Sequence, residues 1–178
     1  EGFVQAWSDG GCDEIAGELC AGAGVFYGDG NPLNAAFSVA ALADRKLSAQ
    51  RAEIAAFTHI LRTEQRPLCV NTDAIYVHDG FLEGRHKWRA RAYFKRPLDA
   101  ELRAHADLWR EVDILLAKRP PNTVKVRWCR GHPLEHHVNW GETSDFRAWG
   151  NTAADGLATR AMYLHHLGAP PLRWWGPS

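Results

Sequence analysis

The chain has 178 residues, 46% of them hydrophobic, and its 21 basic and 21 acidic side chains give a formal net charge of zero. This length allows the core of one domain and is short for two. The balanced charge excludes a general attraction to polyanions, so any surface that binds nucleic acid must be local. No apolar run is long enough to cross a membrane and no signal segment opens the chain, so we expect no membrane partner.

Four cysteines, at positions 12, 20, 69 and 129, follow no spacing typical of metal ligands. Three of them lie in or beside predicted strands, which favours reduced, mostly buried thiols in an intracellular protein over a disulfide framework. Residue 1 is glutamate rather than an initiator methionine, so we expect the chain to be part of a longer polyprotein or complex.

The first part of the chain predicts three strands and one helix. Residues 3–9 form the first expected strand, which Gly10-Gly11 turns back. Residues 20–27 and 34–40 are two further strands, and the turn-forming residues between them favour an antiparallel meander. Residues 48–63 follow as a helix, because a serine stands at the capping position and apolar residues follow it at helical spacing.

The second part of the chain predicts two further strands that alternate with helices. Residues 68–73 form the fourth strand, whose link to the third through a helix favours a parallel pair. A short helix over 74–82 and a longer amphipathic helix, which ends before Pro120-Pro121, precede a fifth strand over 123–129. A last helix is expected over residues 151–166.

Four acidic residues lie where these elements begin or end. Asp9 and Asp73 end strands, Glu53 lies early in a helix, and Asp155 lies near the start of the last helix. An α/β sheet exposes side chains at its strand ends and holds them rigidly, and oxygen atoms are the ligands that Mg²⁺ prefers. Together the four acids predict a site for hard divalent cations, whereas each one alone fits an ordinary turn or helix acid equally well.

Four motifs follow one another along the chain. They are Ser8-Asp9-Gly10-Gly11-Cys12, Ser48-Ala49-Gln50-Arg51-Ala52-Glu53, Thr72-Asp73-Ala74-Ile75-Tyr76, and Gly131-His132 followed by Gly150-Asn151-Thr152-Ala153-Ala154-Asp155. With these motifs the chain resembles, over residues 3–162, the type 1 ribonuclease H family. That family includes the ribonuclease H domains of retroviral and retrotransposon reverse transcriptases. Ala49, where cellular members usually carry asparagine, and Ile75 depart from the family pattern.

The resemblance implies one ribonuclease-H-like α/β domain over residues 1–167. Its five-stranded mixed sheet would hold three antiparallel strands and two parallel ones, with helices on both faces. The basic stretch 84–103 matches a basic protrusion of the family, although such a run of charge is also typical of a solvated helix face. The loop 133–149 is longer than usual, and the tail 168–178, which carries Trp174-Trp175, has no counterpart.

The resemblance also implies a reaction, the endonucleolytic hydrolysis of the RNA strand of RNA–DNA hybrids, which leaves 5′-phosphate and 3′-hydroxyl ends. Two Mg²⁺ ions, for which Mn²⁺ can substitute, would be held by Asp9, Glu53, Asp73 and Asp155. His132 would transfer a proton near the leaving 3′-oxygen, a task that suits an ordinary histidine pKa of about 6.5. Without the motif, a lone histidine in a loop would be read as structural or solvated.

The same resemblance implies contacts with the RNA–DNA hybrid. Gly11, Cys12 and Gln50 would read 2′-hydroxyl groups of the RNA strand, the feature that separates RNA from DNA. Tyr76 and Trp88 would line the channel for the DNA strand. Phosphate contacts would come from the remaining predicted residues, Lys46, Ser48, Arg85, Lys87 and Arg89.

Two alternatives stay open at the level of sequence. One is a nuclease of the same fold that acts on another nucleic acid. The other is a catalytically idle ribonuclease-H-like module that binds hybrids or serves as a scaffold in a larger complex. The four acids and the histidine argue against an idle module, whereas the inserted loop, the aromatic tail, Ala49 and Ile75 keep it open.

Overall fold

The computed structural model describes residues 2–41, 46–96, 101–131 and 144–170, which are built on a five-stranded sheet. The strands are β1 (Val4–Ile15), β2 (Glu18–Phe26), β3 (Ala35–Ser38), β4 (Leu68–Thr72) and β5 (Val124–Trp128), in the spatial order β3-β2-β1-β4-β5. β1, β2 and β3 are antiparallel neighbours, whereas β4 runs parallel to both β1 and β5. The predicted mixed sheet is therefore confirmed.

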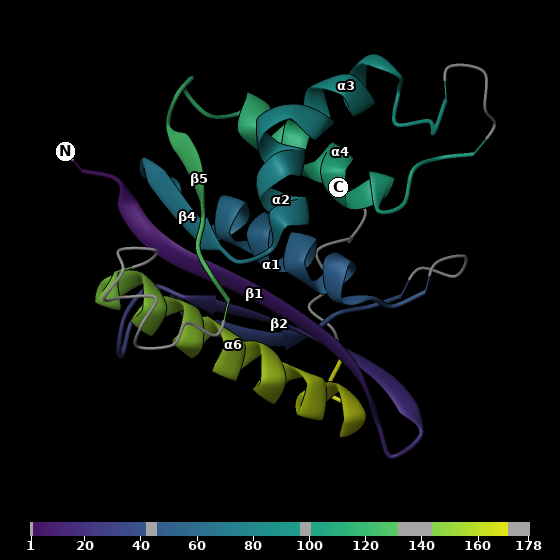
Figure 1. Ribbon diagram of the computed structural model, residues 1–178, viewed down its shortest axis with the longest axis vertical. Coiled ribbons are helices and arrows are strands. Elements are labelled where there is room, and N and C mark those ends of the chain that lie inside the picture. The colour runs from purple at the N-terminus through teal and green to yellow at the C-terminus, as the bar shows by residue number, and fades with distance from the viewer. Residues whose placement is uncertain (1, 42–45, 97–100, 132–143, 171–178) are drawn as a thin grey trace.

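Helices cover both faces of this sheet, as predicted (Figure 1). α6 (Asp145–His166) lies along β1 and β2 on one face, and α1 (Ala49–Thr63) lies against the same two strands on the other. α4 (Ala106–Ala117) packs on α1 as an outer layer. The segment after β4 forms α2 (Ile75–Asp79), a π-helical turn (Gly80–Gly84) and α3 (Arg85–Ala90) in succession, so the predicted short helix over 74–82 continues further than expected.

The residues of β2 alternate to suit the two helices that cover it. Positions 21, 23 and 25 carry alanine and valine, which lie in the core beneath α1. Gly24 faces α6, and a Cβ placed on it would lie 2.3 Å from the backbone oxygen of Ala154. At Gly24, α6 therefore comes close to the backbone of β2, and Asp155 lies close to Asp9, the residue that pairs with Gly24.

α1 begins as the sequence predicts. The Ser48 side chain accepts a hydrogen bond from the backbone N–H of Arg51 at 3.1 Å, which caps the helix. The apolar residues that gave the predicted helical spacing are all buried, namely Ala52, Ala56, Phe57, Ile60 and Leu61. Burial of this stripe against the sheet fixes the rotation of α1 about its axis, and with it the position of Glu53.

The prediction that Gly10-Gly11 turns the first strand back is wrong. β1 continues through both glycines to Ile15, and the chain turns at Ala16-Gly17, whose φ angles are 51° and 83°. The glycines allow close packing instead, since a Cβ on Gly10 would lie 2.2 Å from the backbone nitrogen of Glu53. Adjacent glycines are typical of a turn, and only the position of α1 reveals the other use.

The last helix begins at Asp145 rather than at the predicted Asn151. Ser144 caps this earlier start by accepting a hydrogen bond from the backbone N–H of Arg147 at 3.2 Å. Residues 145–149 therefore belong to α6 and not to an inserted loop. The rest of the predicted loop, up to residue 143, and the predicted tail from residue 171 onward lie outside the described residues.

An aromatic cluster explains why α6 starts early. Trp7 of β1 packs edge-on against Phe146 and Trp149, with ring centroids 4.9 and 5.8 Å away. Gly150 lets the helix approach this indole, because a Cβ there would lie 2.0 Å from the Trp7 ring. The glycine that suggests a helix boundary in the sequence is thus a packing residue inside the helix.

The cysteines are free thiols, as predicted. Cys20, Cys69 and Cys129 are buried, and Cys12 is partly exposed. Within the described residues, no helix combines the length and the apolar composition needed to cross a membrane.

Candidate active site

Asp9 and Asp73 meet because β1 and β4 are parallel neighbours. Ser8 of β1 pairs with Thr72, the last residue of β4, so an aspartate follows at the next position of each strand. The backbone of Asp73 is fixed as well, since its carbonyl oxygen accepts a hydrogen bond from Trp128 Nε1 at 3.1 Å. Backbone pairing therefore places the two carboxylates side by side before any ligand binds.

Glu53 completes a group of three close carboxylates. The contact between α1 and Gly10 brings it beside Asp9. One carboxylate oxygen from each of Asp9, Glu53 and Asp73 lies within 4.8 Å of the other two. Asp155 joins the group from α6, since it lies close enough to Asp9 for its charge to raise the pKa of Asp9. The structure thus brings all four predicted acids together, which we call the acidic group.

Burial and mutual repulsion disfavour negative charge in the acidic group. Asp9 is only 6% exposed, and burial together with the charge of Asp73 raises its pKa from 3.8 to about 7. Burial and the charge of Asp9 likewise raise the pKa of Glu53 well above its ordinary value. A bound cation would offset this repulsion, because it places positive charge between the carboxylates.

The donor atoms of the acidic group fit a hard divalent cation. The buried Oε2 of Glu53 has no hydrogen-bond partner among the described residues, so its lone pairs are open to a ligand. All the donors are carboxylate oxygens, which Mg²⁺ prefers, and Mg²⁺ usually keeps several waters beside one or two carboxylates. Asp9, Glu53 and Asp73 would hold such an ion, with Asp155 beside Asp9 as a further oxygen donor.

Residues to which the sequence analysis gave no role support Asp73. Asn151 donates from Nδ2 to Oδ2 of Asp73 at 3.4 Å, and its Oδ1 accepts a hydrogen bond from the Cys129 thiol at 3.5 Å. Burial and the charge of Asp73 raise the pKa of Cys129 to about 12, so its thiol stays protonated and can donate. Gly131 lies against the same carboxylate, since a Cβ there would be 2.6 Å from Oδ2 of Asp73, and His132 lies outside the described residues. Asn151 stands in the last motif, which was the only sequence signal that it has a role. Only the fold shows that it faces Asp73.

The raised pKa of Asp9 predicts that Asp9→Asn stabilises the metal-free protein at about pH 8. Because the folded protein binds the Asp9 proton more tightly than the unfolded chain does, this group favours folding below about pH 4. That contribution is lost as the pH rises through the window up to about 7. The shift from 3.8 to about 7 corresponds to about 4 kcal/mol, so the amide, which avoids the loss, should raise the Tm by roughly 8–16 °C in calorimetry with a chelator.

Asp13→Asn is the matched control for this experiment, because Asp13 is an exposed acid on the same strand. It should change the Tm by less than about 1 °C. A Tm that Asp9→Asn leaves unchanged or lowers at about pH 8 would contradict the raised pKa.

The family of the chain follows from its sequence as a whole. A sequence model of the family described as RNase H matches residues 2–163, which is nearly the entire chain. The chain belongs to the ribonuclease H family. As a member of this family it is a ribonuclease H hydrolase.

Curated relatives carry the same family name. Ribonuclease H of Cupriavidus necator is 31% identical over 170 residues, which cover 89% of this chain and 94% of the relative. Ribonuclease H of Cupriavidus metallidurans is 33% identical over 114 residues, which cover 63% of this chain and 66% of the relative. The second match thus spans slightly less than two thirds of that relative.

Solved structures show the same fold. The PFV RNase H domain has a TM-score of 0.63 at 23% identity, covering 90% of this chain and 94% of that chain. LC9-RNase H1, a type 1 RNase H with the type 2 active-site motif, has a TM-score of 0.62 at 21% identity. The match covers 94% of this chain and 74% of that chain. A foamy viral protease-reverse transcriptase in complex with an RNA/DNA hybrid has a TM-score of 0.63 at 17% identity. The match covers 89% of this chain and 20% of that chain. These likenesses confirm the predicted ribonuclease H fold.

The residues predicted to read the RNA strand lie beside the acidic group of this ribonuclease H family member. Gly11 and Cys12 follow Asp9 along β1. Gln50 is exposed and precedes Glu53 by three residues, so the two side chains are neighbours on one side of α1. Their contacts with RNA stay predictions.

Two predicted phosphate contacts flank the start of α1. Lys46 is exposed. The hydroxyl oxygen of Ser48 serves as the helix cap, and a hydroxyl that accepts in this way can still donate its hydrogen to a phosphate oxygen. Both residues are therefore available to a phosphate, and their contacts stay predictions.

Tyr76 and Trp88 form one aromatic surface after β4. Their rings stack with centroids 6.2 Å apart, and the hydroxyl of Tyr76 accepts a hydrogen bond from Trp109 Nε1 at 3.2 Å. The guanidinium of Arg103 lies 4.6 Å from the centroid of the Trp88 ring. Together with Lys87, the two aromatic residues line a pocket of about 630 Å³. This arrangement is consistent with a strand-binding surface, and the predicted contact with DNA stays a prediction.

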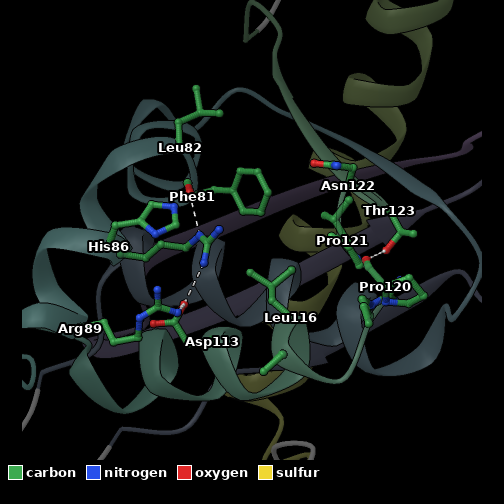
Figure 2. Close-up of a pocket in the computed structure, with 14 residues that line it drawn as sticks. Phe81, Leu82, His86, Arg89, Asp113, Leu116, Pro120, Pro121, Asn122 and Thr123 are labelled. Atoms are coloured by element: carbon green, nitrogen blue, oxygen red, sulfur yellow. Dashed lines mark hydrogen bonds and ion pairs between the residues drawn. The ribbon is translucent and has the colours of Figure 1, made fainter.

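The three predicted phosphate-binding cations of α3 differ in their partners. The guanidinium of Arg85 donates to the carboxylate of Asp113 at 3.1 Å, and Figure 2 shows Arg89 beside the same Asp113. Arg89 is more exposed and lies 3.9 Å from the same carboxylate. Lys87 is 70% exposed and pairs with Glu83 at 3.3 Å. Lys87 and Arg89 are therefore presented to solvent, whereas Arg85 is bound within the protein.

Proposed function

We propose that this chain hydrolyses the RNA strand of RNA–DNA hybrids at the acidic group. The observation that carries the proposal is the geometry of three carboxylates whose oxygens lie within 4.8 Å, one of them with a buried oxygen that has no hydrogen-bond partner among the described residues. Crowding of like charges costs folding free energy, and a cation bound at the site would offset that cost. In a member of the ribonuclease H family, this supports phosphodiester hydrolysis over an idle module.

The proposed cofactor is a pair of Mg²⁺ ions, for which Mn²⁺ can substitute. Asp9, Glu53, Asp73 and Asp155 would hold the ions, which would supply positive charge at the phosphate oxygens and lower the pKa of a bound water. The protein's own part is to fix the ligands: backbone pairing places Asp9 and Asp73, and Asn151 orients the Asp73 carboxylate. The products would carry 5′-phosphate and 3′-hydroxyl ends, with His132 proposed to deliver a proton to the leaving 3′-oxygen.

Recognition of the hybrid is proposed to divide between its two strands. Gly11, Cys12 and Gln50, beside the acidic group, would contact 2′-hydroxyl groups of the RNA strand. Tyr76 and Trp88 would lie against the DNA strand. Contacts with phosphates would come from the exposed cations and a hydroxyl, namely Lys46, Ser48, Lys87 and Arg89, whereas Arg85 would help to fix α3 through Asp113.

We also propose a cellular location for the chain and a larger assembly that contains it. We infer an intracellular protein, because its cysteines are free thiols and three of them are buried. We also infer that the chain works within a longer polyprotein or complex. One of the similar solved structures is itself a protease-reverse transcriptase, of which the matched part covers 20%.

A set of matched substrates tests this proposal. The chain should cut an RNA–DNA hybrid and spare duplex DNA of the same sequence, because the proposed contacts of Gly11, Cys12 and Gln50 need 2′-hydroxyl groups. Deoxyribonucleotides at the cleavage site of the RNA strand should lower the rate by roughly 10³-fold or more, since a site built to bind a hydroxyl group rejects the analogue without it. Gel analysis of end-labelled strands measures both rates.

The control is a hybrid whose deoxyribonucleotides lie away from the cleavage site, which should be cut normally. Equal cutting of hybrid and duplex DNA would favour the nuclease that acts on another nucleic acid. Binding of the hybrid without any cutting would favour the idle module.

A further inference from the structure

A second group of metal-ligating side chains lies where β2 begins and α6 ends. Glu18 is the first residue of β2, Cys20 lies two residues further, and His166 is the last residue of α6. One ligand atom from each residue lies within 4.8 Å of the other two, and Nδ1 of His166 lies 3.3 Å from Oε2 of Glu18. Ligand atoms around tetrahedral zinc, with bonds of about 2.0–2.3 Å, lie roughly 3.5 Å apart, so small side-chain rotations would complete the geometry.

This group is separate from the acidic group. Asp9 pairs with Gly24, which lies four residues beyond Cys20 on β2, and Asp155 lies eleven residues before His166 on α6. At about 3.4 Å per strand residue and 1.5 Å per helix residue, the two groups are roughly 14–17 Å apart along both elements. A single ion therefore cannot bind to both.

The types of ligand favour zinc over magnesium. A thiolate, an imidazole and a carboxylate together are a borderline-soft set that suits Zn²⁺, whereas Mg²⁺ prefers oxygen ligands. His166 also lies at the C-terminus of α6, where the helix dipole attracts a cation.

The backbone around this group is held in place. The ring of the neighbouring His165 contacts the backbone of Ala21 on β2, with Nδ1 3.2 Å from the carbonyl oxygen. Just beyond the helix, the Ser38 hydroxyl of β3 donates to the carbonyl of Ala169 at 3.2 Å. The end of α6 is thus fixed to the sheet on both sides of His166, and the three ligands are preorganised on rigid elements.

We propose that Glu18, Cys20 and His166 form a zinc site whose fourth ligand is water. The side chains of Glu18 and His166 are 56% and 34% exposed, so the ion would enter between them from solvent and reach the buried thiol of Cys20 beneath. A bound ion would tie the start of β2 to the last turn of α6, the helix that also carries Asp155. The site does not depend on the function proposed above.

Cobalt binding tests the site directly, because a thiolate bound to Co²⁺ gives a charge-transfer absorption in the near ultraviolet. The titration uses the full chain with Asp9→Asn and Asp73→Asn, so that the acidic group does not take up the metal. We expect this absorption to saturate at about one Co²⁺ per chain and to disappear when Zn²⁺ is added. Cys20→Ser should abolish it, whereas Cys12→Ser, which changes a partly exposed thiol on the neighbouring strand, should leave it intact.

A second variant keeps the test decisive if Cys20→Ser does not fold. His166→Gln changes a partly exposed side chain and should weaken Zn²⁺ binding by about a hundredfold or more. Even residues that only orient a metal ligand contribute about 10–100-fold to metal affinity. In the chain with Asp9→Asn and Asp73→Asn, Zn²⁺ at about a hundred times its Kd should raise the Tm by roughly 5–10 °C.

Three results would overturn the zinc site. The first is the absence of any thiolate absorption in the chain with Asp9→Asn and Asp73→Asn. The second is an absorption that survives Cys20→Ser. The third is a Zn²⁺ affinity that His166→Gln leaves unchanged. None of these measurements reads RNA cleavage, so their failure would leave the proposed ribonuclease activity untouched.

Discussion

Replacing Asp73 with asparagine should lower cleavage of an RNA–DNA hybrid by about 10³-fold or more. Asp73 belongs to the three carboxylates whose oxygens lie within 4.8 Å, so the amide removes one ligand charge from the centre of the site. It also removes the charge that helps to raise the pKa of Asp9. Hybrid binding should survive within about threefold, because Asp73 is assigned to no contact that supplies affinity. Single-turnover cleavage and a separate binding titration measure the two effects.

Asp29→Asn provides the matched control for this substitution. Asp29 is an exposed acid between β2 and β3, outside the acidic group. Its amide should leave the cleavage rate within about twofold of the parent protein. Near-normal cleavage by Asp73→Asn would show that Asp73 is not a metal ligand, and the proposed chemistry would fail with it.

A methyl group on Gly10 should damage both the fold and the site. In Gly10→Ala the new Cβ would lie 2.2 Å from the backbone nitrogen of Glu53 and 2.4 Å from the carbonyl carbon of Ala52. Both are backbone atoms, so α1 must move away from β1, at a cost of about 2–4 kcal/mol. The Tm should fall by roughly 5–15 °C. At a temperature where the variant is folded, a shift of Glu53 by about 1 Å should lower turnover by about 10²-fold.

Gly156→Ala is the control for this variant. Gly156 lies on α6, and a Cβ there would meet no atom within 4 Å. Alanine is favoured over glycine in a helix, so this change should stabilise the protein by about 0.5–1 kcal/mol. Parent-like stability and turnover in Gly10→Ala would contradict the close contact between β1 and α1.

The sequence predicted the elements whose local pattern and packing agree. The helix over 48–63 combines a capping serine with an apolar stripe, and it ends where predicted. β4 is a short run rich in β-forming residues followed at once by Asp73, and its parallel pairing followed from the helix before it. The mixed sheet could therefore be predicted from local patterns and the resemblance to the ribonuclease H family.

The errors arose at glycines whose role depends on another element. Gly10 lies inside β1 rather than at its end because α1 packs onto it, and Gly150 lies inside α6 because Trp7 packs onto it. A glycine that permits a turn and a glycine that permits close approach look the same in a sequence. The distinction depends on contacts between residues that are far apart along the chain.

In the candidate site, too, the features set by local sequence could be predicted, whereas those set by contacts between distant residues could not. The four acids were found because they stand in recognisable motifs, although Asp9 lies inside β1 and Asp155 in the middle of α6 rather than at the ends of these elements. The support of Asp73 by Asn151 and Cys129 could not be predicted, since it depends on how the end of β5 meets α6. The packing of Phe146 and Trp149 on Trp7 could not be predicted either, because both residues lie in a segment predicted to be a loop.

The most direct test of the proposed activity is one cleavage assay. The RNA strand of an RNA–DNA hybrid carries a label at its 5′ end, and it is incubated with the chain and either Mg²⁺ or a chelator. We predict internal RNA fragments with 3′-hydroxyl ends in Mg²⁺, intact RNA in the chelator, and renewed cleavage when excess Mg²⁺ is added. Fragments that form equally well in the chelator, or RNA that stays intact in Mg²⁺ although the hybrid is bound, would contradict metal-dependent hydrolysis at the acidic group.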